Sequence, residues 1–386
     1  MEELVKRNFK QLGIQRKSAS QPLALEWGKK YLHNIDPTLS RDDTTDGNNI
    51  KELISSTGRE KTKEKLMASL RLVSIQAWNQ VEILLIKEVE RYHINPQLIE
   101  PWEIISDCYK IYEKTLEIYY QQAPLRQLSM IMRLAREGEP LYQKALGIYT
   151  EQVIPTQLTA AIRSQVGTLR KKYTKVDSRI IAFVSMQFHY TSKILLQMLS
   201  PLERPIVESY FRVIDDHLYM PLERAYEAAA QHDYNSQALG AVQQLLPAST
   251  EIAKTITQRI TELYPNYRSK SGILSETAIQ ASSIRDVEMF QIYLWLAVLE
   301  GDVSAIQQEL FPLCLMIYPT LKIEWELIRQ MLYLLGQEIC DRLTHKHLEI
   351  VMPYYQVLWH MFSPHLFGEL GIEKSLKTST DSHFMK

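Results

Sequence analysis

The stretch VIDDHLYMP, residues 213–221, sets two carboxylates beside an imidazole, which are groups that acid–base and metal chemistry use. Asp215, Asp216 and His217 are consecutive, and successive residues of a helix point about 100° apart. Side chains that share one helix face lie three or four positions apart instead. We therefore expect a solvated helix on which Arg212 pairs with the two aspartates. A polar cleft around the three residues, in a helical enzyme, is the alternative.

Pro221 affects the helix that carries these residues. Proline has no N–H, so the carbonyl of His217 receives no helical hydrogen bond, and the helix should kink there or end and restart. A freed carbonyl beside a histidine can line a cleft, which keeps the alternative open.

Other patterns of metal and cofactor chemistry are incomplete. Glu90 and His93 form one Glu-x-x-His pair, but a di-iron bundle needs two. Cys340 with two later histidines lacks a fourth zinc ligand, and its apolar neighbours predict a buried thiol instead. The chain also has no P-loop, G-x-G-x-x-G or G-x-S-x-G motif. We expect a non-catalytic protein without metal or cofactor.

The strongest charge asymmetry lies between Thr156 and Met186, where a net charge of +5 stands in a chain whose total is −1. Such a run can bind phosphate oxygens of nucleic acid. An acidic partner protein, or a merely solvated basic face, is the alternative, since no helix-turn-helix spacing fits. The binding residues that we predict are Arg163, Arg170, Lys171, Lys172, Lys175 and Arg179.

Composition narrows the class of protein. The chain has 386 residues, of which 45% are hydrophobic and 23% charged, as in foldable soluble proteins. Its 13 glycines make turn-rich β folds less favourable, and its three separated cysteines fit a reducing compartment. The apolar windows 289–301 and 310–319 are too short to span a bilayer. We expect a cytoplasmic protein without membrane insertion, and leave oligomerisation open.

The body repeats one pattern, the amphipathic helix. Apolar residues recur at steps of three and four, as in Leu66, Leu70, Val73, Ala77, Val81 and Leu84. Ser200 and Glu203 form a capping box, Gly301 fits a helix stop, and Gly336 fits close packing of two helices. Alternating strand patterns are nearly absent. The predicted fold class is all-α, a multi-helix bundle.

Polarity divides the chain into four parts. We expect a short N-terminal helical segment (1–35), a polar linker or loop (36–63), an all-helical body (64–370) and a flexible tail (371–386). The body offers two halves, 64–232 and 233–370. Residues 199–214 align without gaps on 343–358, with five identities. This echo fits a duplicated helical hairpin, and equally two amphipathic helices that share only their periodicity.

Four phrases of the body carry a family resemblance: VSMQFHYT (184–191), YFRVIDDHLYMPLERAY (210–226), SSIRDVEMFQIYLWLAVLEG (282–301) and QELFPLCLMIYP (308–319). Over roughly residues 64–368 the chain resembles cyanobacterial helical proteins related to heterocyst differentiation, the HetZ-type group. The resemblance implies a cytoplasmic regulatory protein that binds DNA and acts in transcriptional or developmental control. A protein–protein adaptor or scaffold without nucleic-acid binding is the alternative.

Overall fold

The described part of the chain is built from helices alone. The computed structural model describes residues 20–31, 52–53, 55–121, 160–201, 203–233 and 235–370. Within them, extended pairing is limited to one isolated bridge between Arg268 and Ile273. The predicted all-α class is confirmed. None of the described helices combines the length and apolarity that crossing a membrane requires.

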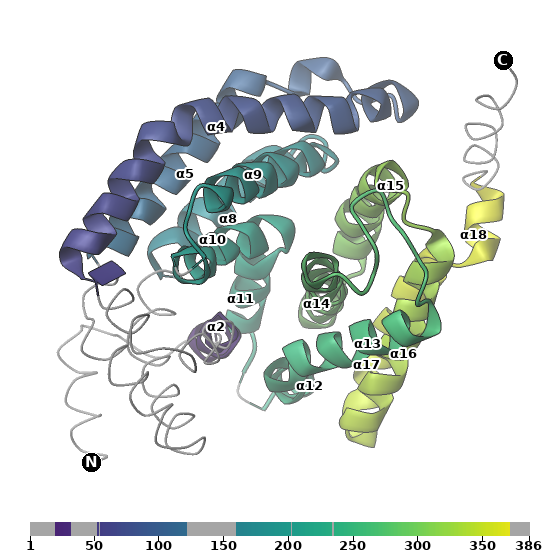
Figure 1. Cartoon of the computed structure of the whole chain (residues 1–386). Coiled ribbons are helices and arrows are strands. Elements are labelled where there is room, and N and C mark those ends of the chain that lie inside the picture. Colours follow the sequence, from purple (N-terminus) through teal and green to yellow (C-terminus); the bar gives the residue numbers. More distant parts are fainter. Residues whose placement is uncertain are drawn as a thin grey trace, which may run out of the picture.

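The first half of the body follows a short N-terminal helix. Its helices are α2 (Ser20–Lys29), α4 (Ser56–Arg91), the 3₁₀ turn η2 (Pro96–Leu98), α5 (Pro101–Gln121), α8 (Ala160–Thr174), α9 (Ile180–Gln197), α10 (Arg204–Tyr219) and α11 (Leu222–Ala230). α2 lies in the N-terminal helical segment that the sequence predicts. In Figure 1 the long helices α4 and α5 form one side of the molecule, with α8, α9 and α10 inside them.

The second half carries the remaining helices. They are α12 (Gln237–Leu245), the 3₁₀ turn η4 (Leu246–Ala248), α13 (Ser249–Leu263), α14 (Thr277–Glu300), the π-helical turn η5 (Ile306–Leu310), α15 (Phe311–Thr320), α16 (Trp325–Arg342), α17 (His345–Met361) and α18 (Pro364–Glu369). α14 lies in the middle of the molecule, between the first half and α16–α17 (Figure 1).

The helix α4 begins earlier than its hydrophobic pattern indicates. The Ser55 hydroxyl accepts the Gly58 N–H at 3.0 Å and caps the helix. Residues 56–63, which we assigned to a polar linker, are therefore its first two turns, and the linker prediction is wrong there. Residues 36–51 and 371–386 lie outside the described residues. The predicted stripe from Leu66 to Leu84 is buried, against α9 and α5.

Three local sequence predictions are confirmed: a capping box, a helix stop and a close approach of two helices. The Ser200 N–H donates to Glu203 Oε2 at 3.0 Å, and the Glu203 N–H donates to Ser200 Oγ at 3.3 Å, as in a capping box. Gly301 ends α14 with φ of 65°, a left-handed conformation that glycine tolerates. Gly336 faces the Tyr355 ring, so α16 and α17 approach closely there.

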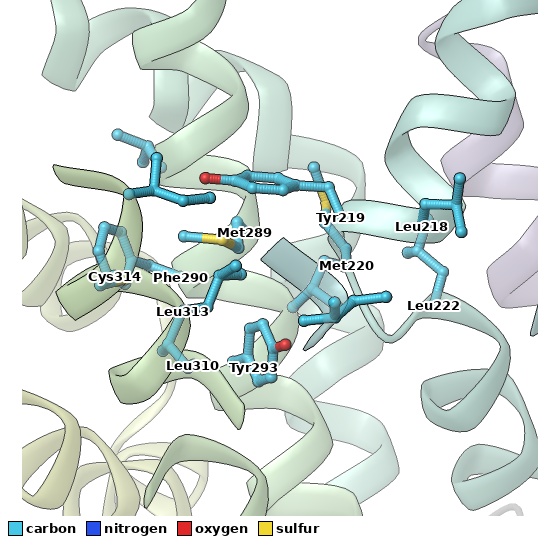
Figure 2. Packing of buried hydrophobic residues seen from close by; sticks show 14 of the residues in the cluster. Leu218, Tyr219, Met220, Leu222, Met289, Phe290, Tyr293, Leu310, Leu313 and Cys314 are labelled. Atoms are coloured by element: carbon cyan, nitrogen blue, oxygen red, sulfur yellow. The ribbon is translucent and has the colours of Figure 1, made fainter. Parts of the chain in front are cut away.

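The chain breaks at Pro221 as predicted. α10 ends at Tyr219, Met220 is extended, and α11 restarts at Leu222. The turn is buried against α14 and α15. Figure 2 shows two residues of this turn, Tyr219 and Met220, beside Met289, Tyr293 and Leu313. Burying the turn forces its polar neighbours to find partners inside the protein.

The two halves share one hydrophobic core that runs without a break from α2 to α18. α14 packs on α11, and α15 packs on α4 and α9. The chain positions 64–232 and 233–370 are thus parts of one packed body. The segments of the sequence echo are placed alike: α10 packs on the preceding helix α9, and α17 on the preceding helix α16. The duplication itself stays a prediction.

Candidate functional site

Two exposed lysines of the basic run, Lys171 and Lys172, lie beside carboxylates of neighbouring helices. Lys171 Nζ is 2.8 Å from Glu227 Oε2 on α11. Lys172 Nζ is 2.8 Å from Glu103 Oε1 on α5, and it also donates to Asp107. Ion pairs at such exposed positions contribute little stability, but they cancel charge that phosphate would otherwise meet.

Arg170, central to the predicted phosphate-binding set, is buried. Its guanidinium donates to the Leu218 carbonyl at the end of α10, to the Tyr293 hydroxyl on α14, and to Glu309 Oε2 at 2.9 Å. These bonds use its fork of donors within the protein. Arg170 is a structural residue and does not reach a surface ligand, so its assignment to a DNA contact is wrong.

Of the three remaining residues in the predicted phosphate-binding set, two are paired with carboxylates and one is not. Arg163 Nε lies 3.2 Å from Glu223 Oε2. Arg179 makes a two-point contact with Asp177, whose closer distance is 2.6 Å, and also donates to the Tyr92 carbonyl. Lys175 is exposed and has no ion-pair partner among the described residues. Five of the six predicted cations are thus paired with carboxylates, which lowers the unpaired positive charge of this region. DNA binding stays a prediction.

The predicted solvated helix at Asp216 is also wrong, because this residue is the centre of a buried ion-pair cluster. Lys30 Nζ lies 2.7 Å from Asp216 Oδ2 and 2.6 Å from Glu288 Oε2, and both carboxylates are 4% exposed. The Tyr31 hydroxyl donates to Asp216 Oδ2 at 3.0 Å. Burial alone would raise the pKa of Asp216, but the Lys30 ammonium outweighs it and holds that pKa below its ordinary value.

Asp215 faces a second group of charges, in which Asp215, Arg285 and Asp286 are each half-buried. The Arg285 guanidinium lies over the Tyr219 ring at 4.8 Å, and the Tyr219 hydroxyl donates to Asp286 Oδ1 at 3.0 Å. Asp215 Oδ1 is enclosed without a described hydrogen-bond partner. Burial raises the pKa of Asp215 to about 7 and that of Asp286 to about 6. The expected pairing of Arg212 with the aspartates is wrong as well, since Arg212 binds Glu208 at 3.0 Å.

His217 is buried in its neutral form. Its Nδ1 is 2.8 Å from the Val213 carbonyl, which can only accept, so Nδ1 carries the proton and Nε2 has a free lone pair. Burial lowers the pKa of His217 to about 4. Nε2 has no described hydrogen-bond partner. Three consecutive residues therefore point to three different surroundings, as the helix geometry predicted.

A small pocket of about 90 Å³ lies at this break between α10 and α11. His217, Pro221, Arg170, Lys171, Arg224 and Glu309 are among the residues that line it. Glu309 is neutralised by Arg170 at 2.9 Å and Arg224 at 2.8 Å, and Asp216 is held by Lys30. Glu223 also lines the pocket, and within the described residues the hydrogen bond of His217 goes to the Val213 carbonyl and not to a carboxylate.

Metal chemistry finds no support in the described ranges, where no group of three or more histidine, cysteine or acidic side chains could hold an ion. Cys340 is exposed, so the prediction of a buried thiol is wrong at this position. Cys108 and Cys314 are buried.

Two exposed apolar surfaces stand out on the body. On α4, Leu72, Ile83 and Ile86 are 61%, 78% and 49% exposed. At 100° per residue they lie within about 60° of one another, on one face of the helix. We call these three residues the α4 stripe. The second surface is the pair Tyr333 and Trp359, whose rings lie 6.4 Å apart across α16 and α17.

The residues that the sequence did not indicate are the partners of the predicted ones. Four such partners lie far along the chain from the residues that they contact: Lys30, Glu288, Arg285 and Glu309. The one local signal is the sequence Trp27-x-x-Lys30-Tyr31, which places a cation and two aromatic rings on one side of a short helix.

Comparison with known proteins gives one match. A family model described as phycobilisome protein matches residues 214–360, from the last turns of α10 through α17, which is less than half of the chain. No curated protein and no solved structure matches the chain.

Proposed function

We propose that this chain is a non-catalytic regulatory protein that acts by binding another protein. The observation that carries the proposal is the α4 stripe, whose three large aliphatic side chains are exposed. Helix α4 itself lies on the outer side of the molecule (Figure 1). Grouped apolar side chains of this size on one helix face are typical of protein-binding surfaces.

The residues around the α4 stripe fit the same reading. Arg71, Asn79, Glu82 and Lys87 are exposed on α4 between and beside the stripe residues. Exposed apolar side chains with polar and charged ones between and beside them are compatible with a protein interface, whose rim is polar. A nucleic-acid surface would instead need an excess of unpaired cations.

One further observation supports a partner protein over DNA. Four of the six predicted phosphate-binding residues, Arg163, Arg170, Lys171 and Lys172, are paired with carboxylates from α5, α11 and η5. We extend the proposal to a cytoplasmic, cyanobacterial regulator, in line with the HetZ-type resemblance of the sequence. DNA binding remains a prediction from sequence alone.

The test uses tagged full-length chain, cross-linked in the source cell and analysed for both protein and DNA. We expect Leu72→Glu combined with Ile83→Glu to reduce recovery of specific partner proteins at least tenfold, because charges would enter the apolar centre of the interface. Leu263→Glu is the matched control, since Leu263 is a large exposed side chain on α13.

Purified chain is then titrated with duplex DNA at increasing salt. We expect weak binding that is unchanged by Lys171→Glu. Tight, salt-steep binding that this change abolishes, with partner recovery unaffected by the α4 variants, would refute the proposal in favour of DNA.

A further inference from the structure

The short helix α2 and the two residues after it dock on the junction between the two halves of the body. α2 packs on α11 and η4, and Leu23, Ala24, Trp27 and Tyr31 are buried by this contact region. A helix of ten residues is not stable alone in water. Its helical form therefore depends on the surface that receives it.

That surface selects for a positive charge. Asp216 on α10 and Glu288 on α14 both contact Lys30 Nζ, at 2.7 and 2.6 Å, and the Thr250 hydroxyl donates to the second Glu288 oxygen at 2.7 Å. Removal of Lys30 would leave two buried carboxylates without this ammonium, which is strongly unfavourable. We call the surface formed by Asp216, Glu288, Trp295, α11 and η4 the α2 docking site.

The docking site also recognises aromatic rings at fixed spacing. Trp27 meets the Trp295 ring edge-on, with centroids 6.3 Å apart, and the Lys30 ammonium lies 3.9 Å from the Trp27 ring centre. Trp27 Nε1 donates to the Tyr31 hydroxyl, and that hydroxyl donates to Asp216. One aromatic residue, a lysine three positions later and a second aromatic residue next to it thus form a single hydrogen-bonded unit.

The fit of α2 to its site is incomplete. Trp295 Nε1 and the Tyr226 hydroxyl, both buried, have no described hydrogen-bond partner. Trp295 contacts Trp27, and Tyr226 lies on α11 near enough to Tyr31 to help raise its pKa, after burial and Asp216. A helix that made the aromatic and lysine contacts of α2, and also offered oxygen atoms to these two donors, would bind the site better than α2 does.

We propose that the α2 docking site is a receptor for a helix of a partner protein, and that Leu23–Tyr31 fills it until that helix displaces it. The partner helix carries an aromatic residue, a lysine three positions on and an aromatic residue directly after the lysine. This inference rests on the proposed protein-binding function and names the chemistry of one partner segment. Because the site joins Asp216 of one half to Glu288 of the other, its occupant also bridges the two halves.

The test measures binding of a fluorescent synthetic peptide, residues 20–31, to full-length hosts by fluorescence anisotropy. The hosts are the unchanged chain and the Trp27→Ala chain, in which the resident segment is weakened while Lys30 is kept. We expect the peptide to bind the Trp27→Ala host at least tenfold more tightly. The same peptide carrying Lys30→Glu should bind at least tenfold more weakly than the unchanged peptide, because it would bring a third carboxylate to Asp216 and Glu288.

Equal affinity for the two hosts, or equal affinity of the two peptides, would overturn the inference. If the Trp27→Ala host does not fold, amide hydrogen exchange of the unchanged chain decides. Amides of residues 23–28 should exchange at least tenfold faster than those of α14, and uniform exchange of both would overturn the inference.

Other occupants give different results. A concentration-dependent dimer whose cross-links join Lys30 of one chain to Glu288 of another would overturn the assignment, because the site would then belong to a second copy. None of these outcomes depends on Leu72 or Ile83, which lie on a different helix, so the peptide experiment and the α4 experiment fail independently.

Discussion

Asp215 shows how the interior of this protein acts on a single ionisable group. Its folded-state pKa of about 7 lies above the ordinary value of 3.8, and burial is the main cause. Between these two pH values the unfolded chain gives up the proton before the folded chain does. Stability contributed by this residue is therefore present at acidic pH and is lost as the pH rises towards 7.

We accordingly expect Asp215→Asn to gain stability relative to the unchanged chain as the pH rises from 4.5 to 7.5. The asparagine has no proton to lose, so it escapes the penalty of a buried negative charge. Urea unfolding of both proteins at several pH values measures the difference. His217 and His189, whose pKa values are lowered by burial, affect both proteins alike. A difference that stays constant across the range would contradict the assignment.

At the level of residues, the sequence predicted types and spacing better than surroundings. The divergence of Asp215, Asp216 and His217 follows from helix geometry and is confirmed. The burial of Asp216 and His217 is not deducible locally, because the cation that neutralises Asp216 is Lys30, at the other end of the first half. Arg170 was misassigned for the same reason, since its acceptors come from α10, α14 and η5.

Helix α16 approaches α17 closely at one point, where Gly336 faces the Tyr355 ring. The Tyr355 hydroxyl donates to the Leu332 carbonyl at 2.9 Å, which holds the ring in place. A methyl group at position 336 would collide with that ring, so one of the two helices would have to move.

We expect Gly336→Ala to lower the free energy of unfolding by about 1–3 kcal/mol, as overpacked cores do. Gly368→Ala is the control, because nothing lies within 4 Å of its added methyl group. That change should leave stability within about 0.5 kcal/mol. Thermal and urea unfolding of both variants provide the measurement. Equal stability of the two variants would show that the added methyl group fits between α16 and α17, and would contradict the prediction.

The sequence predicted the beginnings and ends of helices better than it predicted the surroundings of single residues, because the signals for helix ends are local. The capping box at Ser200 and the glycine stop at Gly301 involve residues within one or two turns of each other. The start of α4 at Ser56 was missed, since its first turns carry charged residues that resemble a linker. Their helix is stabilised by the Ser55 cap and by contacts such as Lys63 with Glu117 on α5, which no local pattern reveals.

The whole molecule depends on charged contacts that cross from one half to the other. Arg170 on α8 and Arg224 on α11 both bind Glu309 of η5, and Arg224 also binds Glu300 of α14 at 2.6 Å. Arg170 reaches four elements in total, counting its own. The pair of Arg170 and Glu309 is the most enclosed part of this network, and removing one partner of such a pair is strongly destabilising, since the other loses its compensation.

Arg170→Ala should lower the free energy of unfolding by about 3–5 kcal/mol, because it leaves Glu309 and the Leu218 carbonyl without their buried donor. Lys175→Ala, from the same basic run, should change it by less than about 0.5 kcal/mol. Urea unfolding compares the two. Similar effects from both changes would mean that Arg170 is no more structural than an exposed lysine.

The length of α4 sets a lower limit on the size of any protein that covers its outer face. Leu72 and Ile86 are fourteen residues apart, which at 1.5 Å per residue is about 21 Å along the axis. A ligand must extend over four helical turns to touch both ends at once. Short loops and single side chains would reach only a fraction of that span. The length of a binding partner therefore limits which proteins can contact the whole stripe, whatever the chemistry of their side chains.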